Sequence, residues 1–169
     1  MKDNKIFHRV EVIFFSIIIL NFIGFFDNAY AFFHDLTSQR NGVIEESKKI
    51  IESLFNRVNI ASNKYQNEIA SLSPSLNNNV TKVNKTQEYI DNLKEIISSA
   101  NRTTVQQDYK PVLTNYIDSL ENELESYVHY NKYIITGNIT ENQISMDLLS
   151  KAFNYETQAI NEYKKVELQ

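Results

Sequence analysis

The chain has 169 residues, contains no cysteine and carries a formal net charge of −4 at pH 7. The lack of cysteine excludes disulfide bonds, thiol catalysis and cysteine metal sites. A mildly acidic chain with interspersed charges of both signs is a poor ligand for nucleic acid or an anionic membrane surface, so we expect neither as the main partner.

The N-terminal 31 residues have the three parts of a secretory signal peptide. Basic residues come first, an apolar run over 12–26 follows, and the small residues Ala29 and Ala31 stand at alternate positions after it. We therefore predict a signal peptide over 1–31, cleaved after Ala31, and an extracytoplasmic domain over 32–169.

An uncleaved membrane anchor is the alternative interpretation of this segment. At about 1.5 Å per residue the apolar run reaches roughly 22 Å, short of the roughly 30 Å hydrocarbon core of a bilayer. The basic residues before the run favour an N-terminus inside the cell, so both interpretations place the domain outside the cytoplasm. We expect contact with a membrane only through the N-terminal segment, and only if this segment stays uncleaved.

From residue 36 onward the pattern is helical almost without pause. Apolar residues recur about every 3.6 residues, the period of amphipathic helices, and no strand-like alternation of useful length occurs. We predict four helices, at about 36–72, 74–100, 108–136 and 140–168. Short connections between long helices favour an all-α, up-down-up-down antiparallel four-helix bundle over a long two-stranded coiled coil.

Turn and capping residues set the expected boundaries. Pro74 suits the first turn of the second helix, and Asp108 can cap a third helix that has Pro111 in its first turn. Gly137 is a natural C-cap, and residues 140–143, Thr-Glu-Asn-Gln, have the spacing of a capping box.

Four sequons are candidate glycosylation sites, at Asn79, Asn84, Asn101 and Asn138. The chain is rich in Asn, Ile, Lys and Tyr, which have A/T-rich codons, and this bias favours a prokaryotic source. Several sequons arise by chance in such a composition.

Catalytic and metal patterns are weak. A di-iron bundle needs Glu-x-x-His on two helices, and neither His34 nor His129 has Glu three residues before it. Glu125 and His129 share a face at i, i+4 and could hold one ion weakly, but a solvated pair is the simpler interpretation. Zinc-protease, EF-hand, nucleophile-elbow and phosphate-loop patterns do not occur.

A run of alternate carboxylates, Glu121, Glu123 and Glu125, is also a poor acid/base site. Side chains at i, i+2 point to different faces of a helix, so we expect the three to be solvated. We accordingly predict no enzymatic activity and no cofactor.

The tyrosines form the one candidate binding surface. Tyr127, Tyr130 and Tyr133 follow one another at i+3, and the fourth helix carries Phe153 and Tyr155. Because the third and fourth helices should pair around Gly137, we expect Tyr130, Tyr133 and Phe153 to lie near one another. Aromatic rings with polar tips suit a partner or ligand surface, and a tyrosine-filled core is the alternative.

The sequence thus predicts an exported, non-enzymatic helical bundle of the prokaryotic cell envelope. It would act as an interaction or scaffold module on another envelope protein, with a homo-oligomer left open. The second hypothesis is an extracytoplasmic ligand-sensing bundle that works with a separate signalling or transport subunit.

Overall fold

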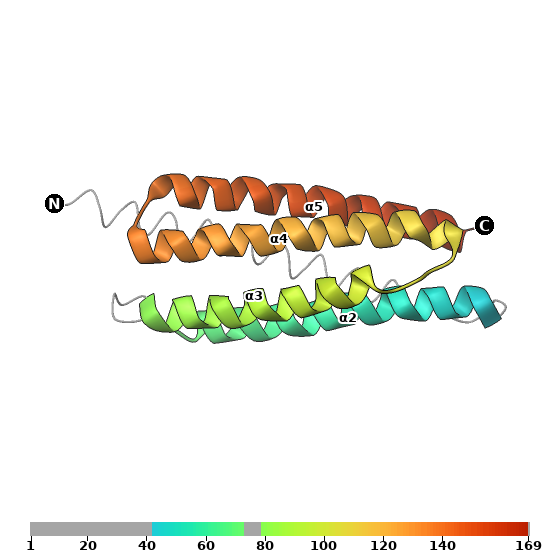
Figure 1. The fold of residues 1–169 in the computed structure, drawn as a ribbon, viewed down its shortest axis with the longest axis horizontal. Coiled ribbons are helices and arrows are strands. Elements are labelled where there is room, and N and C mark those ends of the chain that lie inside the picture. The colour runs from blue at the N-terminus through green and yellow to red at the C-terminus, as the bar shows by residue number, and fades with distance from the viewer. Residues whose placement is uncertain (1–41, 73–78, 169) are drawn as a thin grey trace. The chain divides into compact units, whose positions relative to one another are not determined.

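The computed structural model describes residues 42–72 and 79–168, which fold as four long α-helices and one short 3₁₀ turn (Figure 1). The elements are α2 (Gly42–Ala70), α3 (Asn79–Asn101), η2 (Gln107–Tyr109), α4 (Lys110–Thr136) and α5 (Ile139–Glu167). These two ranges contain no strand, so the predicted all-α class is confirmed.

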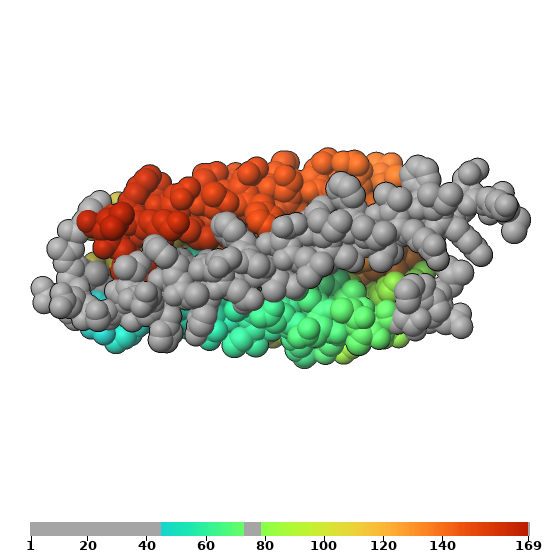
Figure 2. Space-filling model, turned by 180° about the vertical axis from the view of Figure 1, so that it is seen from behind, coloured from blue at the N-terminus to red at the C-terminus, as the bar shows by residue number. Residues whose placement is uncertain are grey.

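Successive helices run in opposite directions, as predicted for an up-down-up-down bundle (Figure 1). Helix α2 packs on α3, α3 on α4, and α4 on α5. Figure 2 shows α5 and α2 on the reverse face. Side chains of the two helices meet near the C-terminal end of α5. There the Tyr163 hydroxyl donates to Glu52 Oε1 over 3.3 Å, and Lys48 forms an ion pair with Glu167.

Helices α4 and α5 form the most extensive contact of the bundle, because small residues face each other along it. Ser119 donates its hydroxyl proton to the Ala152 carbonyl over 2.9 Å, and Ser126 donates to the Ser145 carbonyl over 2.8 Å. All four residues are buried. These two bonds fix the axial register of α5 against α4.

The end of α4 confirms the prediction for Gly137. This residue is the C-cap with φ 69°, a left-handed conformation that glycine adopts without a Cβ clash, and its N–H bonds the Tyr133 carbonyl over 2.8 Å. Pro111 lies in the first turn of α4, also as predicted.

Two capping predictions are wrong. Asp108 lies inside η2, and the N-cap position of α4 is Tyr109, which makes no side-chain cap bond. The cap of α5 is Asn138, whose side chain accepts from the Thr140 N–H over 3.0 Å, in place of a capping box that starts at Thr140. The backbone reverses direction at Gly137. Asn138, the extended residue that precedes α5, therefore follows Gly137 directly and takes the N-cap position.

Several predictions lie outside the described residues: the signal peptide or anchor over 1–31 with Ala29 and Ala31, the helix start over 36–41, and the helix start at Pro74. Among residues 42–72 and 79–168, no helix combines the length and the apolar character that a membrane span requires.

Candidate functional site: a buried acid cluster

Glu123 lies in the core of the bundle, with 1 % of its surface exposed. It follows Leu120 and precedes Tyr127 at the 3–4 spacing of the buried face of α4. The expectation that Glu121, Glu123 and Glu125 are all solvated is therefore wrong for Glu123. It is confirmed for Glu121 and Glu125, which are exposed on a different face of α4 from that of Glu123.

A tyrosine from the neighbouring helix holds one oxygen of Glu123. The Tyr89 hydroxyl donates to Glu123 Oε1 over 2.7 Å, while Glu123 Oε2 is buried and has no hydrogen-bond partner. Burial raises the pKa of Glu123 to about 7, because the charged form loses its hydration, and the bond from Tyr89 offsets part of this rise.

Glu156 is a second buried carboxyl group, on α5, with 1 % of its surface exposed. It stands between Ala152 and Ala159 on the face packed against α4, and neither of its oxygens has a hydrogen-bond partner. Burial raises the pKa of Glu156 well above its usual value, and the charge of Glu123 raises this pKa further.

The helix geometry explains why these two carboxyl groups interact. Glu123 lies four residues after Ser119 and Glu156 four residues after Ala152, on opposite sides of the Ser119–Ala152 hydrogen bond. Side chains lean toward the N-terminus of their own helix, and α4 and α5 are antiparallel. The two carboxyl groups therefore lean toward each other across this bond.

Tyr116 completes what we call the acid cluster, the set of Tyr116, Glu123 and Glu156. Its ring is fully buried with its centroid 4.1 Å from that of Phe55, and its hydroxyl has no hydrogen-bond partner. Burial raises the pKa of Tyr116, and the charges of Glu156 and Glu123 raise it further. The cluster thus holds four buried oxygens that have no hydrogen-bond partner in the part of the chain that the structure describes.

A second buried group, the tyrosine layer, consists of Tyr65, Tyr89 and Tyr127 from three helices. Tyr65 and Tyr89 stack with centroids 4.8 Å apart, and Tyr127 meets both edge-on, at 5.2 and 4.9 Å. Thr86 gives its proton to the Lys82 carbonyl, so Tyr65 is the donor in its 2.9 Å bond with Thr86. The Tyr65 and Tyr89 hydroxyls are therefore paired.

The predicted aromatic surface is divided by the fold. Tyr127 is a core residue, as the tyrosine-core alternative has it, whereas Tyr130 and Tyr133 are half-buried with centroids 6.3 Å apart. Phe153 follows Ala152, which is bonded to Ser119, eleven residues before Tyr130 on α4. At about 1.5 Å per residue this places Phe153 roughly 16 Å along the bundle from Tyr130, so their expected proximity is wrong.

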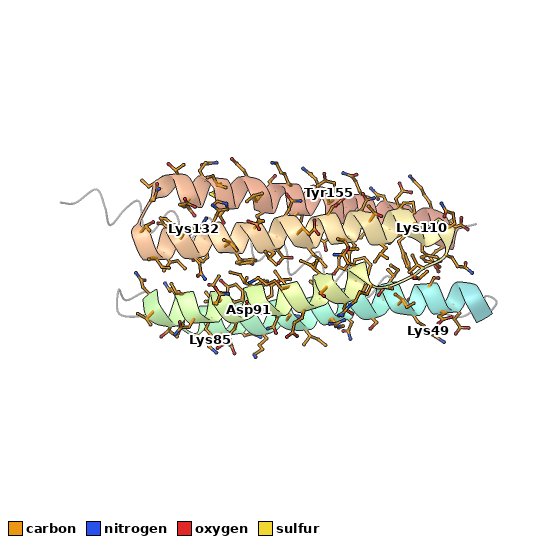
Figure 3. All side chains as sticks on the ribbon, in the orientation of Figure 1. Lys49, Lys85, Asp91, Lys110, Lys132 and Tyr155 are labelled. Carbon is orange, nitrogen blue, oxygen red and sulfur yellow. The ribbon has the colours of Figure 1, made fainter. Side chains whose placement is uncertain are left out.

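Tyr155 belongs to α5 and is half-buried (Figure 3). Like Phe153, it lies beyond the Ser119–Ala152 level and away from Tyr130 and Tyr133. The structure therefore brings together two of the five predicted surface residues, Tyr130 and Tyr133.

The Glu125–His129 pair does not form a metal site. His129 Nδ1 lies 2.6 Å from Glu141 Oε2 on α5, and both of these side chains are about four-fifths buried. Glu125 is exposed on a neighbouring turn. In the part of the chain that the structure describes, no three His, Cys, Asp or Glu side chains converge as metal ligands.

The sequon residues and one surface groove complete the candidate sites. Asn79, Asn84, Asn101 and Asn138 are all exposed. A groove of about 640 Å³ runs between α3 and α4. Its lining is Lys94, Ile97, Ser98, Asn101, Arg102, Glu121, Leu124 and Glu125.

Helical spacing was the one sequence signal that could have identified the acid cluster. Glu123 and Glu156 each occupy a position that the 3–4 pattern of their helix assigns to the core, whereas residue type alone assigns them to solvent. No protein-family model, curated protein or solved structure matches the chain, so the site is interpreted from its own geometry.

Proposed function

We propose that this chain is an exported, non-enzymatic helical-bundle protein of the prokaryotic cell envelope that acts as an interaction or scaffold module. The signal-like pattern of residues 1–31 supports export. The observation that carries the binding role is an exposed apolar end of the bundle.

This end, the apolar tip, consists of Val80, Ile135 and Ile139, with 72 %, 68 % and 65 % of their surfaces exposed. Ile135 and Ile139 flank the turn at Gly137. Val80 lies at the start of α3, and Asn131 Nδ2 donates to the Val83 carbonyl over 3.3 Å, which sets this part of α3 beside the end of α4. Apolar side chains gathered at one exposed end are typical of protein-binding surfaces.

The acid cluster supports a surface-mediated role because it is closed to solvent. Its carboxyl groups are buried in the core of the bundle, so a substrate cannot reach them in this conformation. A general acid or base must lie within hydrogen-bond reach of the group that reacts. Binding of a partner protein at the apolar tip requires no access to these carboxyl groups.

A ligand-sensing bundle is the second candidate, favoured by the groove between α3 and α4. Lys94 and Arg102 line it together with Glu121 and Glu125, so it offers charges of both signs. This arrangement fits a small zwitterionic ligand. The sensor would work with a separate signalling or transport subunit.

Site-specific photocrosslinking in cells distinguishes these functions. A photoreactive residue placed at Ile135 or Ile139 should trap an envelope protein, and the same residue at Ile60, an exposed isoleucine on α2, is the matched control. Ile135→Asp with Ile139→Asp should abolish binding of the trapped protein to the purified full chain without changing its melting temperature. Equal trapping at Ile60, or unchanged binding by the double variant, contradicts the proposal.

The sensor hypothesis makes a different prediction in the same preparation. A zwitterionic metabolite that binds the native state would raise the melting temperature of the full chain, and Arg102→Ala would remove that shift. Such a result without trapping at the tip would replace the scaffold role by the sensor role.

A further inference from the structure

We propose that Glu123 and Glu156 form a proton-binding site whose charge state controls how tightly α5 packs against α4. The proposal is independent of the partner or ligand of the bundle. It rests on the burial of the two carboxyl groups, on their surroundings and on their place in the α4–α5 contact.

Among the described residues, no Lys, Arg or His acts on the pair to stabilise two carboxylates. Within the described ranges, the titratable groups that interact with the pair are Tyr89 from α3 and Tyr116 and Tyr127 from α4, and the charge of Glu123 acts on Glu156. Tyr65 of α2 lies farther from the pair, and its ring meets that of Tyr127 edge-on.

The unpaired oxygens show that the pair is not a completed hydrogen-bond network. Glu156 Oε1 and Oε2, Glu123 Oε2 and the Tyr116 hydroxyl are all buried without a hydrogen-bond partner among residues 42–72 and 79–168. Folded proteins satisfy the great majority of such atoms, and an unpaired buried carboxylate is far costlier than a neutral carboxyl group. The surroundings therefore favour the protonated pair, and loss of both protons leaves two like charges that repel each other.

The effect of proton loss falls on the α4–α5 contact. The carboxyl groups lie on either side of the Ser119–Ala152 hydrogen bond, one helical turn away along each helix. At the level of the Ser119–Ala152 bond, charge repulsion and water entry should separate the faces of α4 and α5 that their small residues hold together. Loosening should therefore begin here and leave the tyrosine layer in place.

The direction of the pH effect follows from the raised pKa values. Between the unfolded pKa of Glu, near 4.5, and the folded pKa of Glu123, about 7, the native state holds more protons than the unfolded chain. Stability is therefore greatest at acidic pH and is lost as pH rises through 7. Glu156 extends the loss to higher pH, because its pKa is also raised.

The test is the melting temperature of the full chain between pH 5 and pH 8, measured by circular dichroism. We expect it to fall by on the order of 10 °C through Glu123 alone. The double variant Glu123→Gln with Glu156→Gln keeps the shape of both side chains and removes both titrating groups. It should reduce the fall in melting temperature to a small fraction of the wild-type fall. The matched control, Glu121→Gln with Glu125→Gln, changes two exposed carboxylates of α4 and should retain the whole fall.

A spectroscopic readout keeps the proposal falsifiable if the double variant folds poorly. Infrared spectra of the wild-type chain at pH 6 should show the C=O stretch of a protonated carboxyl group, and Glu156→Gln alone should remove part of it. No such band, or a pH-dependent melting temperature unaltered by the double variant, overturns the proposal. Recovery of the melting temperature at pH 8 by Mg²⁺ or Ca²⁺ also overturns it, in favour of a cation site.

Discussion

The tyrosine layer and the acid cluster are neighbouring regions of one core that bury oxygen atoms in opposite ways. In the tyrosine layer the Tyr65 hydroxyl is paired with Thr86, and Tyr89 is paired with Glu123. In the acid cluster the Tyr116 hydroxyl and both oxygens of Glu156 have no partner. Buried oxygens that are hydrogen-bonded therefore stabilise the tyrosine layer, whereas buried oxygens without partners destabilise the acid cluster.

Packing explains why the two regions differ. The tyrosine layer joins α2, α3 and α4 through large rings. The hydroxyls of Tyr65 and Tyr89 reach partners beyond these ring contacts. The α4–α5 contact is built from Ser and Ala, which bring the backbones close and leave few side-chain groups that could pair with Glu156. Close backbone packing therefore strengthens this contact and leaves the carboxyl group unpaired.

The largest effect should come from the tyrosine layer. Tyr127→Ala removes the ring that contacts both Tyr65 and Tyr89, and we expect it to lower the free energy of unfolding by about 3–5 kcal/mol, the usual cost of deleting a buried aromatic side chain. Urea denaturation measures the loss, with the half-buried Tyr155→Ala as control. A change below about 1 kcal/mol would instead favour the surface role that the sequence suggested for Tyr127.

The sequence predicts some features of the bundle and misses others. The helix ends at Pro111 and Gly137 were predictable because backbone constraints act locally. The burial of Glu123 was not predicted, because a charged residue was assigned to solvent by its type although its spacing placed it in the core. The opposite case is Val80, which lies exposed although its residue type is typical of a core.

The expected aromatic surface does not form because its residues lie at different distances from the turn at Gly137. Pairing of α4 and α5 around Gly137 was correct, but Tyr130 stands seven residues before Gly137 and Phe153 sixteen residues after it. In an antiparallel hairpin only residues at similar distances from the turn meet. The observed bonds Ser126–Ser145 and Ser119–Ala152 follow this rule.

An intermediate effect should come from the bond that joins the two regions. Tyr89→Phe keeps the stacked ring and leaves Glu123 Oε1 without its donor, so we expect a loss of about 1–3 kcal/mol at pH 7. The Tyr89 bond lowers the pKa of Glu123, so its removal should raise that pKa further. Denaturation at several pH values measures both changes, and Tyr155→Phe is the control. An unchanged titration midpoint would show that Tyr89 does not stabilise the carboxylate.

The smallest effect should come from Tyr116→Phe. It makes the same chemical change as Tyr89→Phe, but in the acid cluster, and so gives the sharpest contrast between the two regions. Tyr116→Phe removes a buried hydroxyl that has no partner, while the ring contact with Phe55 remains. We expect the free energy of unfolding to stay the same or rise by up to about 1 kcal/mol, since no hydrogen bond is lost and no polar group remains to be desolvated. Urea denaturation beside Tyr89→Phe compares the two directly. If Tyr116→Phe lost as much as Tyr89→Phe, its hydroxyl would have a partner in solution, and the acid cluster would be a hydrogen-bonded network like the tyrosine layer.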